Sequence, residues 1–223
     1  MRRHWLGIIS ALSLSTLSAC AQPTTQLSDK FTEDIHRIKN LDPSIRPSRV
    51  KIIDTPGAST QCGAADQSSF TAFFCPDDQT IYTNNSTLQT IYDAYGRAGL
   101  RYLAAHELAH ARQNAVTGYA KNLVWSSVLD ELQADCIAGA YLRQAYGYTA
   151  EDPNGENVRD LAFKLGDKIF YSHNWHGNPR WRQAAVSRGL RQGSATSCLS
   201  SKTFNYESLL ERGNQWLKFL QKN

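Results

Sequence analysis

The sequence lacks an excess of charge of one sign, a membrane-spanning run of apolar residues and any internal repeat. Its 223 residues include 24 basic and 20 acidic side chains, which give a formal net charge of +4. Such a balance argues against a nucleic acid or polyanion partner. Charge blocks and long linkers are missing as well. With 41% hydrophobic and 20% charged residues, the composition is that of one ordinary globular domain rather than a disordered chain.

Residues 1–19 have the layout of an export signal, with a basic head followed by an apolar stretch from Trp5 to Leu17. This stretch is shorter than the roughly 20 apolar residues that a membrane span requires. The string Leu17-Ser18-Ala19-Cys20 resembles the lipobox of bacterial lipoproteins, in which the cysteine is acylated and becomes the mature N-terminus. The alternative is a secretory signal that is cleaved nearby, with Cys20 incidental.

In the lipoprotein interpretation, residues 1–19 are a signal peptide, 20–27 a polar tether and 28–223 the folded domain. A lipid on Cys20 would hold the protein on a membrane of the bacterial cell envelope. Ala21 follows the cysteine. By resemblance to lipoprotein sorting, this favours the outer membrane, facing the periplasm, if the host is Gram-negative.

An even number of cysteines remains once Cys20 is assigned to the lipid: Cys62, Cys75, Cys136 and Cys198. In an oxidising compartment this suggests two disulfides, with three possible pairings. Cys62 and Cys75 are close in sequence and flank an expected strand, so we pair them, which leaves Cys136 with Cys198. The alternative is four buried free thiols, which export disfavours. None of the cysteines has the CxxC spacing of a structural zinc site.

Hydrophobic periodicity predicts one α+β domain that is mainly helical and has a small sheet. Short β-prone runs at 50–53, 70–74 and 80–83 indicate three strands. The turn-like tetrapeptide 75–78 joins the last two strands into a hairpin. We expect helices near 28–39, 100–116 after a break at Gly96 or Gly99, 126–147, 156–170 and 180–191, and a last helix with Leu209, Leu210, Trp216 and Leu220.

A His-Glu-x-x-His string, His106 to His110, lies inside one of these helices. Residues four apart share a helix face, so both imidazoles can bind one metal ion. Glu107, next to His106, can approach a bound water as a general base. The alternative is a helix with two histidines and no metal.

A second helix supplies a pair of carboxylates, Glu131 and Asp135, again four residues apart. Carboxylates on a half-buried, otherwise apolar helix need a cation or hydrogen-bond donors. We expect Glu131 to complete a His₂Glu zinc site and Asp135 to accept the outer N–H of a ligand histidine. Without these partners the pair would be a solvated face. The metzincin extension is excluded, because Gln113 and Val116 stand where it requires glycine and histidine.

Several sequence blocks, in the same order, resemble the putative neutral zinc metallopeptidase family of bacteria, a group of glutamate-liganded zincins. The resemblance covers roughly residues 50–205 and is most specific at 131–136. It implies a zincin-like metallopeptidase domain with one zinc ion per chain. The other matching blocks are Cys62-Gly63, Phe73 to Pro76, Ile81-Tyr82, His106 to His110, Gly166-Asp167, His176-Gly177 with Arg182 and Gly189, and Cys198 with Thr203-Phe204.

The resemblance also implies that His176 lies near the zinc, where it could donate to the oxyanion of the tetrahedral intermediate. The alternative is a loop or helix-cap histidine, and His173 in the same stretch receives no role. Arg182 could hold this loop or pair with Asp135. The chain departs from the family at 109–111, where members often have Gly-His-His, which concerns substrate preference more than metal binding.

The sequence therefore predicts a zinc-dependent peptidase that acts on a peptide or protein substrate. Zinc is held by His106, His110 and Glu131, and the catalytic residues are Glu107 and His176. One rival is a non-catalytic zinc-containing lipoprotein that acts in envelope assembly or quality control. A purely structural zinc site would have four protein ligands and no spare carboxylate such as Glu107. A second rival is an amidase for cell-wall peptides, which shares the site and differs in substrate.

Overall fold

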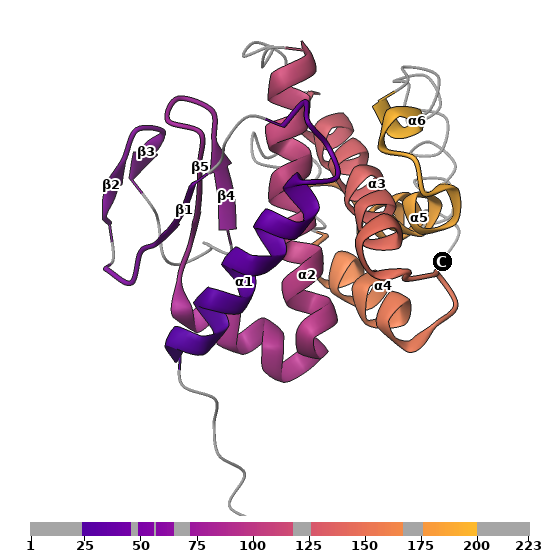
Figure 1. The fold of residues 1–223 in the computed structure, drawn as a ribbon, viewed down its shortest axis with the longest axis horizontal. Coiled ribbons are helices and arrows are strands. Elements are labelled where there is room, and N and C mark those ends of the chain that lie inside the picture. The colour runs from indigo at the N-terminus through magenta and orange to yellow at the C-terminus, as the bar shows by residue number, and fades with distance from the viewer. Residues whose placement is uncertain are drawn as a thin grey trace, which may run out of the picture.

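The computed structural model describes residues 24–45, 49–55, 57–64, 72–117, 126–166 and 176–199. Cys20, the export signal, His173 and the expected last helix lie outside these ranges. Helices dominate and a small sheet lies at one side, which confirms the predicted mainly helical α+β class (Figure 1). The elements are α1 (Thr24–Lys39), β1 (Arg49–Ile52), β2 (Ser59–Thr60), β3 (Gly63–Ala64), β4 (Ala72–Cys75), β5 (Thr80–Thr83), α2 (Asn85–Thr117), α3 (Ser126–Tyr146), α4 (Pro153–Leu165), α5 (Pro179–Gln192) and α6 (Ala195–Leu199).

Helix α2 is the centre of the fold (Figure 1). It packs against α1, α3, α4 and strand β4, and every residue from Tyr102 to Gln113 is buried. The helix is kinked at Gly96, whose φ of 60° and ψ of −153° are not helical. Glycine adopts such a positive φ without the steric penalty of a Cβ atom. The break expected at Gly96 or Gly99 is therefore at Gly96.

The main sheet has the strand order β1-β5-β4, with β1 parallel and β4 antiparallel to β5. The predicted β4–β5 hairpin is confirmed, with Phe74 opposite Ile81. Strand β4 is one edge of this sheet and lies against α2. A second, two-stranded sheet of β2 and β3 was not predicted, because strands of two residues carry no readable alternation. The Cys62–Cys75 disulfide ties this small hairpin to the end of β4.

Helix α1 begins at Thr24, earlier than the predicted 28, and so takes in part of the expected tether. The reason is Leu27, which is 1% exposed and forms one buried stripe with Phe31, Ile35 and Ile38. This spacing continues a single apolar helix face. No helix within the described ranges is long and apolar enough to cross a membrane.

Helices α3 and α5 cross at very short distance. A Cβ atom on Gly139 of α3 would collide with the carbonyl oxygen of Val186, and one on Gly189 of α5 would collide with that of Cys136. The two glycines therefore let the helix backbones touch. The Cys136–Cys198 disulfide joins α3 to the short helix α6, so both predicted cysteine pairings are present.

Candidate metal centre

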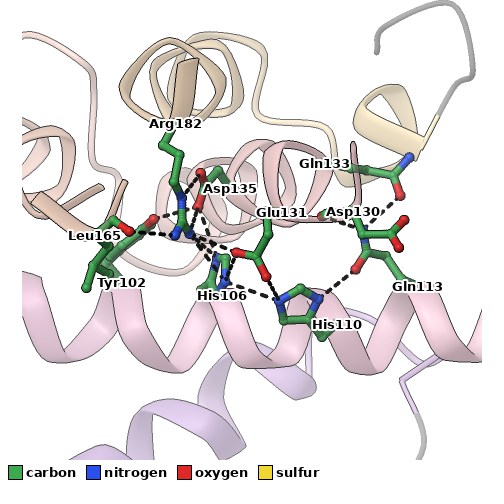
Figure 2. A network of polar contacts seen from close by, with 10 residues as sticks. All are labelled: Tyr102, His106, His110, Gln113, Asp130, Glu131, Gln133, Asp135, Leu165 and Arg182. Carbon is green, nitrogen blue, oxygen red and sulfur yellow. Dashed lines mark hydrogen bonds and ion pairs between the residues drawn. The ribbon is translucent and has the colours of Figure 1, made fainter. Parts of the chain in front are cut away.

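His106 and His110 lie one turn apart on the buried part of α2, and their rings turn the same nitrogen toward each other. The two Nε2 atoms are 3.2 Å apart. Figure 2 shows both side chains pointing from α2 toward α3. The four-residue spacing of the motif thus brings both imidazoles to one point, as predicted from helix geometry.

Glu131 of α3 faces this point from the other side. Its Oε2 lies 3.2 Å from His106 Nε2, and its Oε1 lies 3.4 Å from His110 Nε2. The ligand atoms of His106, His110 and Glu131 all lie within 4.8 Å of one another, and these residues are the one group in the described ranges that could hold a metal ion. For tetrahedral zinc with ligands near 2.0–2.1 Å, neighbouring ligand atoms are roughly 3.3 Å apart. The donor set therefore fits a zinc ion in type and in spacing.

Glu107 lies beside these three residues but is not part of the donor group. It is 3% exposed and its carboxylate accepts a backbone hydrogen bond from Phe74 of β4. Its Oε2 is nevertheless one of the buried oxygens of the described residues that have no hydrogen-bond partner. Burial raises the pKa of the Glu107 carboxyl, although the neighbouring His106 and His110 oppose the shift. Burying a carboxylate oxygen without a hydrogen-bond donor costs free energy. Native proteins that keep such an unsatisfied group often use it for catalysis.

Asp135, one turn beyond Glu131 on α3, supports His106 from behind. Its Oδ1 lies 3.0 Å from His106 Nδ1, the nitrogen that faces away from Glu131. The hydroxyl of Tyr102 donates to the same oxygen at 2.6 Å. This is the carboxylate–histidine arrangement that orients metal-ligating histidines, and it places Asp135 where the sequence predicted.

The guanidinium of Arg182 comes from α5 and lies between the two carboxylates (Figure 2). Nε and Nη2 donate to Asp135 at 2.8 and 2.9 Å, and Nη2 is 3.2 Å from Glu131 Oε2. Burial opposes ionisation of Glu131, but Arg182 and His106 hold the pKa of its carboxyl well below the ordinary range. Of the two roles left open for Arg182, pairing with Asp135 is therefore the one that these contacts bear out.

Two opposing effects act on the pKa of His106. Burial alone would lower it, but hydrogen bonds to Asp135 and Glu131 raise the pKa to about 10. Metal binding therefore has to displace a proton from His106 at neutral pH, so metal affinity is expected to fall in acid.

His176 was also predicted to lie near the zinc. It is exposed and directly precedes Gly177 and the α5 N-cap Asn178. It does not belong to the donor group. Its predicted role at an oxyanion stays a prediction, as does the lipid on Cys20.

Comparison with known proteins was consistent with this site. The family model described as "Putative neutral zinc metallopeptidase" matches residues 46–201. The chain is 29% identical over 167 residues to the uncharacterized protein YpfJ of Escherichia coli K12, covering 62% of this chain and 56% of that protein. It is 37% identical over 169 residues to the uncharacterized protein Rv2575 of Mycobacterium tuberculosis H37Rv, covering 62% and 57%. The chain thus spans just over half the length of these curated relatives. No solved structure matches it.

Proposed function

Because the chain belongs to the putative neutral zinc metallopeptidase family, we propose that it hydrolyses peptide bonds with a zinc ion held by His106, His110 and Glu131. The observation that carries this proposal is the closeness of their ligand atoms, which are 3.2 to 3.4 Å apart and so match the spacing of ligands around one zinc ion. When bound, zinc supplies Lewis acidity, which acidifies water and polarises a carbonyl oxygen.

Glu107 is the general base in this proposal. It follows His106 directly and its Oε2 has no hydrogen-bond partner among the described residues, so this oxygen can accept a proton. The hydrogen bond from Phe74 limits how far the carboxylate can turn. The raised pKa of the buried carboxyl brings it closer to the operating pH, which favours both taking a proton from water and passing it to the leaving amine.

Strand β4 is the proposed place for the substrate backbone. It is an edge of the main sheet, it lies against α2, and its Phe74 contacts the proposed base. An extended peptide that adds to such an edge would run past Glu107 and be held through main-chain hydrogen bonds. This supports a peptide or an unfolded protein segment as substrate.

The test is a cleavage assay with a library of unstructured peptides. The full-length protein with zinc bound should cleave a subset of the library. A chelator should abolish the cleavage, and one equivalent of zinc should restore it. If protein that demonstrably contains zinc cleaves no peptide of the library, the proposal is contradicted.

We also propose that Cys20 carries a lipid that anchors the protein in the bacterial cell envelope. This rests on the string Leu17-Ser18-Ala19-Cys20 and the apolar stretch before it.

A further inference from the structure

His110 receives its outer support from an amide rather than from a carboxylate. Its Nδ1 lies 2.9 Å from Oε1 of Gln113, which is on the next turn of α2. The Nε2 atom faces His106 and Glu131. Because a glutamine oxygen only accepts, Nδ1 must carry a proton, and in the neutral ring Nε2 then keeps its lone pair for a metal.

The assignment of the proton to His110 Nδ1 depends on the orientation of the Gln113 amide, because a flipped amide would present its NH₂ group to His110. Gln113 Nε2 donates to the carbonyl oxygen of Asp130 at 2.8 Å and to Gln133 Oε1 at 3.0 Å. Gln133 in turn donates from Nε2 to the carbonyl oxygen of Cys198 at 3.3 Å. This series of hydrogen bonds ends on both sides at a backbone carbonyl, which can only accept. Turning either amide would bring two acceptors together, so each amide has one favourable orientation.

The last acceptor in this series, the carbonyl of Cys198, belongs to helix α6, which has only five residues. Besides the hydrogen bond from Gln133 and the burial of Ala195 and Cys198 in the core, a covalent bond and a polar contact hold α6 to the rest of the fold. One is the Cys136–Cys198 disulfide to α3, and the other is a 3.5 Å contact between Thr196 Oγ1 and Arg112 of α2. Since the α6 helix is too short to be stable alone, the disulfide helps to fix where the Cys198 carbonyl lies.

We propose that Gln113 and Gln133 form a positioning relay, anchored by the Cys136–Cys198 disulfide, that selects the tautomer and orientation of His110 for metal binding. The relay rests on the zinc site of the proposed function. It acts through His110 and touches neither substrate nor metal. Loss of any of its links should weaken zinc binding while leaving the three ligands in place.

The first measurement is the zinc dissociation constant, obtained by competition with a chromogenic chelator on full-length protein. Gln113→Leu should raise it by about 10- to 100-fold, the effect typical of a lost outer partner of a metal ligand. Gln133→Leu, one link further away, should raise it by a smaller factor. Gln144→Leu is the matched control. Gln144 is also on α3 and also donates to a backbone carbonyl, that of Gly193 at 2.6 Å, but it lies outside the relay.

The second measurement separates positioning from general loss of structure. In ¹⁵N NMR spectra of the zinc-loaded protein, His110 should show a protonated Nδ1 and a metal-bound Nε2. In Gln113→Leu, the Nδ1 proton should exchange faster with water, while the signals of His106 should keep their positions.

The third measurement tests the anchor. Cys136→Ala/Cys198→Ala should weaken zinc binding, and Cys62→Ala/Cys75→Ala, which removes the disulfide at β4, should not. If the Cys136→Ala/Cys198→Ala variant does not fold, Gln133→Glu tests the anchor instead. Its carboxylate still accepts from Gln113 but cannot donate to the Cys198 carbonyl.

The possible outcomes are distinguishable. If the wild-type protein binds no zinc, the proposed function fails and the relay fails with it. If wild-type zinc binding is tight and Gln113→Leu matches it, the relay alone is overturned. If Gln113→Leu weakens zinc binding but neither Gln133→Glu nor loss of Cys136–Cys198 does, the disulfide anchor is overturned.

Discussion

A single buried cation, the guanidinium of Arg182, holds two carboxylates of the site in place. Its side chain is 3% exposed, and those of Asp135 and Glu131 are 0% and 14% exposed. Charges at such depth are stable only when they are paired. A zinc ion bound by Glu131 would neutralise it as Arg182 does, so each cation should reduce the need for the other.

This predicts that Arg182→Met destabilises the zinc-free protein more than the zinc-loaded protein. Removing one partner of a buried pair costs about 3–5 kcal/mol, and zinc should recover part of this loss by pairing with Glu131. Chemical unfolding with and without chelator measures both values. Arg180→Met, at an exposed position of the same helix, is the control and should change stability by less than about 0.5 kcal/mol. Equal losses with and without zinc would contradict the shared role.

The metal donors could be predicted from the sequence, and most of their supporting residues could not. His106, His110 and Glu131, with Asp135 behind them, follow from four-residue spacings on two helices. The roles of Tyr102 and Gln133 depend on how different helices pack, and the pairing of Arg182 with Asp135 was only one of two roles that the sequence left open. Arg182 and Asp135 are 47 residues apart, and no local pattern relates positions on two helices at that separation. Gln113 is different, because its place three residues after His110 on the same helix could have suggested the contact.

At the scale of elements, the close crossing of α3 and α5 brings Arg182 to the candidate metal centre. The crossing depends on Gly139 and Gly189, where any Cβ atom would collide with backbone of the other helix. Arg182 lies two turns before Gly189 on α5 and reaches across to α3. Separation of the two helices should therefore displace the arginine.

Gly189→Ala tests this dependence. Within a helix, Gly to Ala normally stabilises by up to about 1 kcal/mol. Here the clash with the Cys136 carbonyl should reverse the sign and lower the free energy of unfolding by about 1–3 kcal/mol, as overpacking does. Zinc affinity should fall as well. Thermal or denaturant unfolding gives the first value and chelator competition the second. Arg188→Ala, exposed on the neighbouring position, is the control, and a stabilised Gly189→Ala variant would show that the helices do not need this contact.

The sequence predicted the long helices well and the short elements poorly. Long helices with apolar periodicity, such as α3 and α5, were found nearly at their bounds. Helix α4 begins at Pro153 rather than at the predicted 156, with Asp152 as N-cap accepting from Asn154 and Gly155. That Asp-Pro pair is a start signal that could have been used. Helix α6 and the β2–β3 pair are too short to leave any pattern.

At the scale of the whole molecule, the proposed lipid would place the site at a membrane surface. Cys20→Ser should move the protein to the soluble fraction or leave its signal uncleaved, because serine offers no thiol for acylation. Cell fractionation with mass spectrometry of the N-terminus measures this. Cys62→Ser, which alters a disulfide rather than the lipobox, serves as control. An unchanged, fully processed membrane form of Cys20→Ser would rule out the lipid on this residue.

Two roles are open to a zinc ion at this site: it serves hydrolysis, or it only holds the fold. Glu107 separates the two roles, because only hydrolysis would need it. It lies at the donor group without belonging to it, and its Oε2 is buried without a hydrogen-bond partner in the described part of the chain. Glutamine is nearly isosteric with the glutamate that it replaces in Glu107→Gln. Its amide can still accept from Phe74 but cannot take a proton from water at neutral pH.

The most direct test is therefore the rate of peptide cleavage by Glu107→Gln, measured together with its zinc content. The variant should keep one zinc per chain and wild-type thermal stability, and its rate should fall by at least the roughly 10²- to 10⁴-fold that general bases contribute. His110→Ala, by comparison, should lose zinc and activity together. Zinc-loaded Glu107→Gln that cleaves at the wild-type rate, or that fully rescues a deletion strain in which His110→Ala fails, would contradict the peptidase assignment.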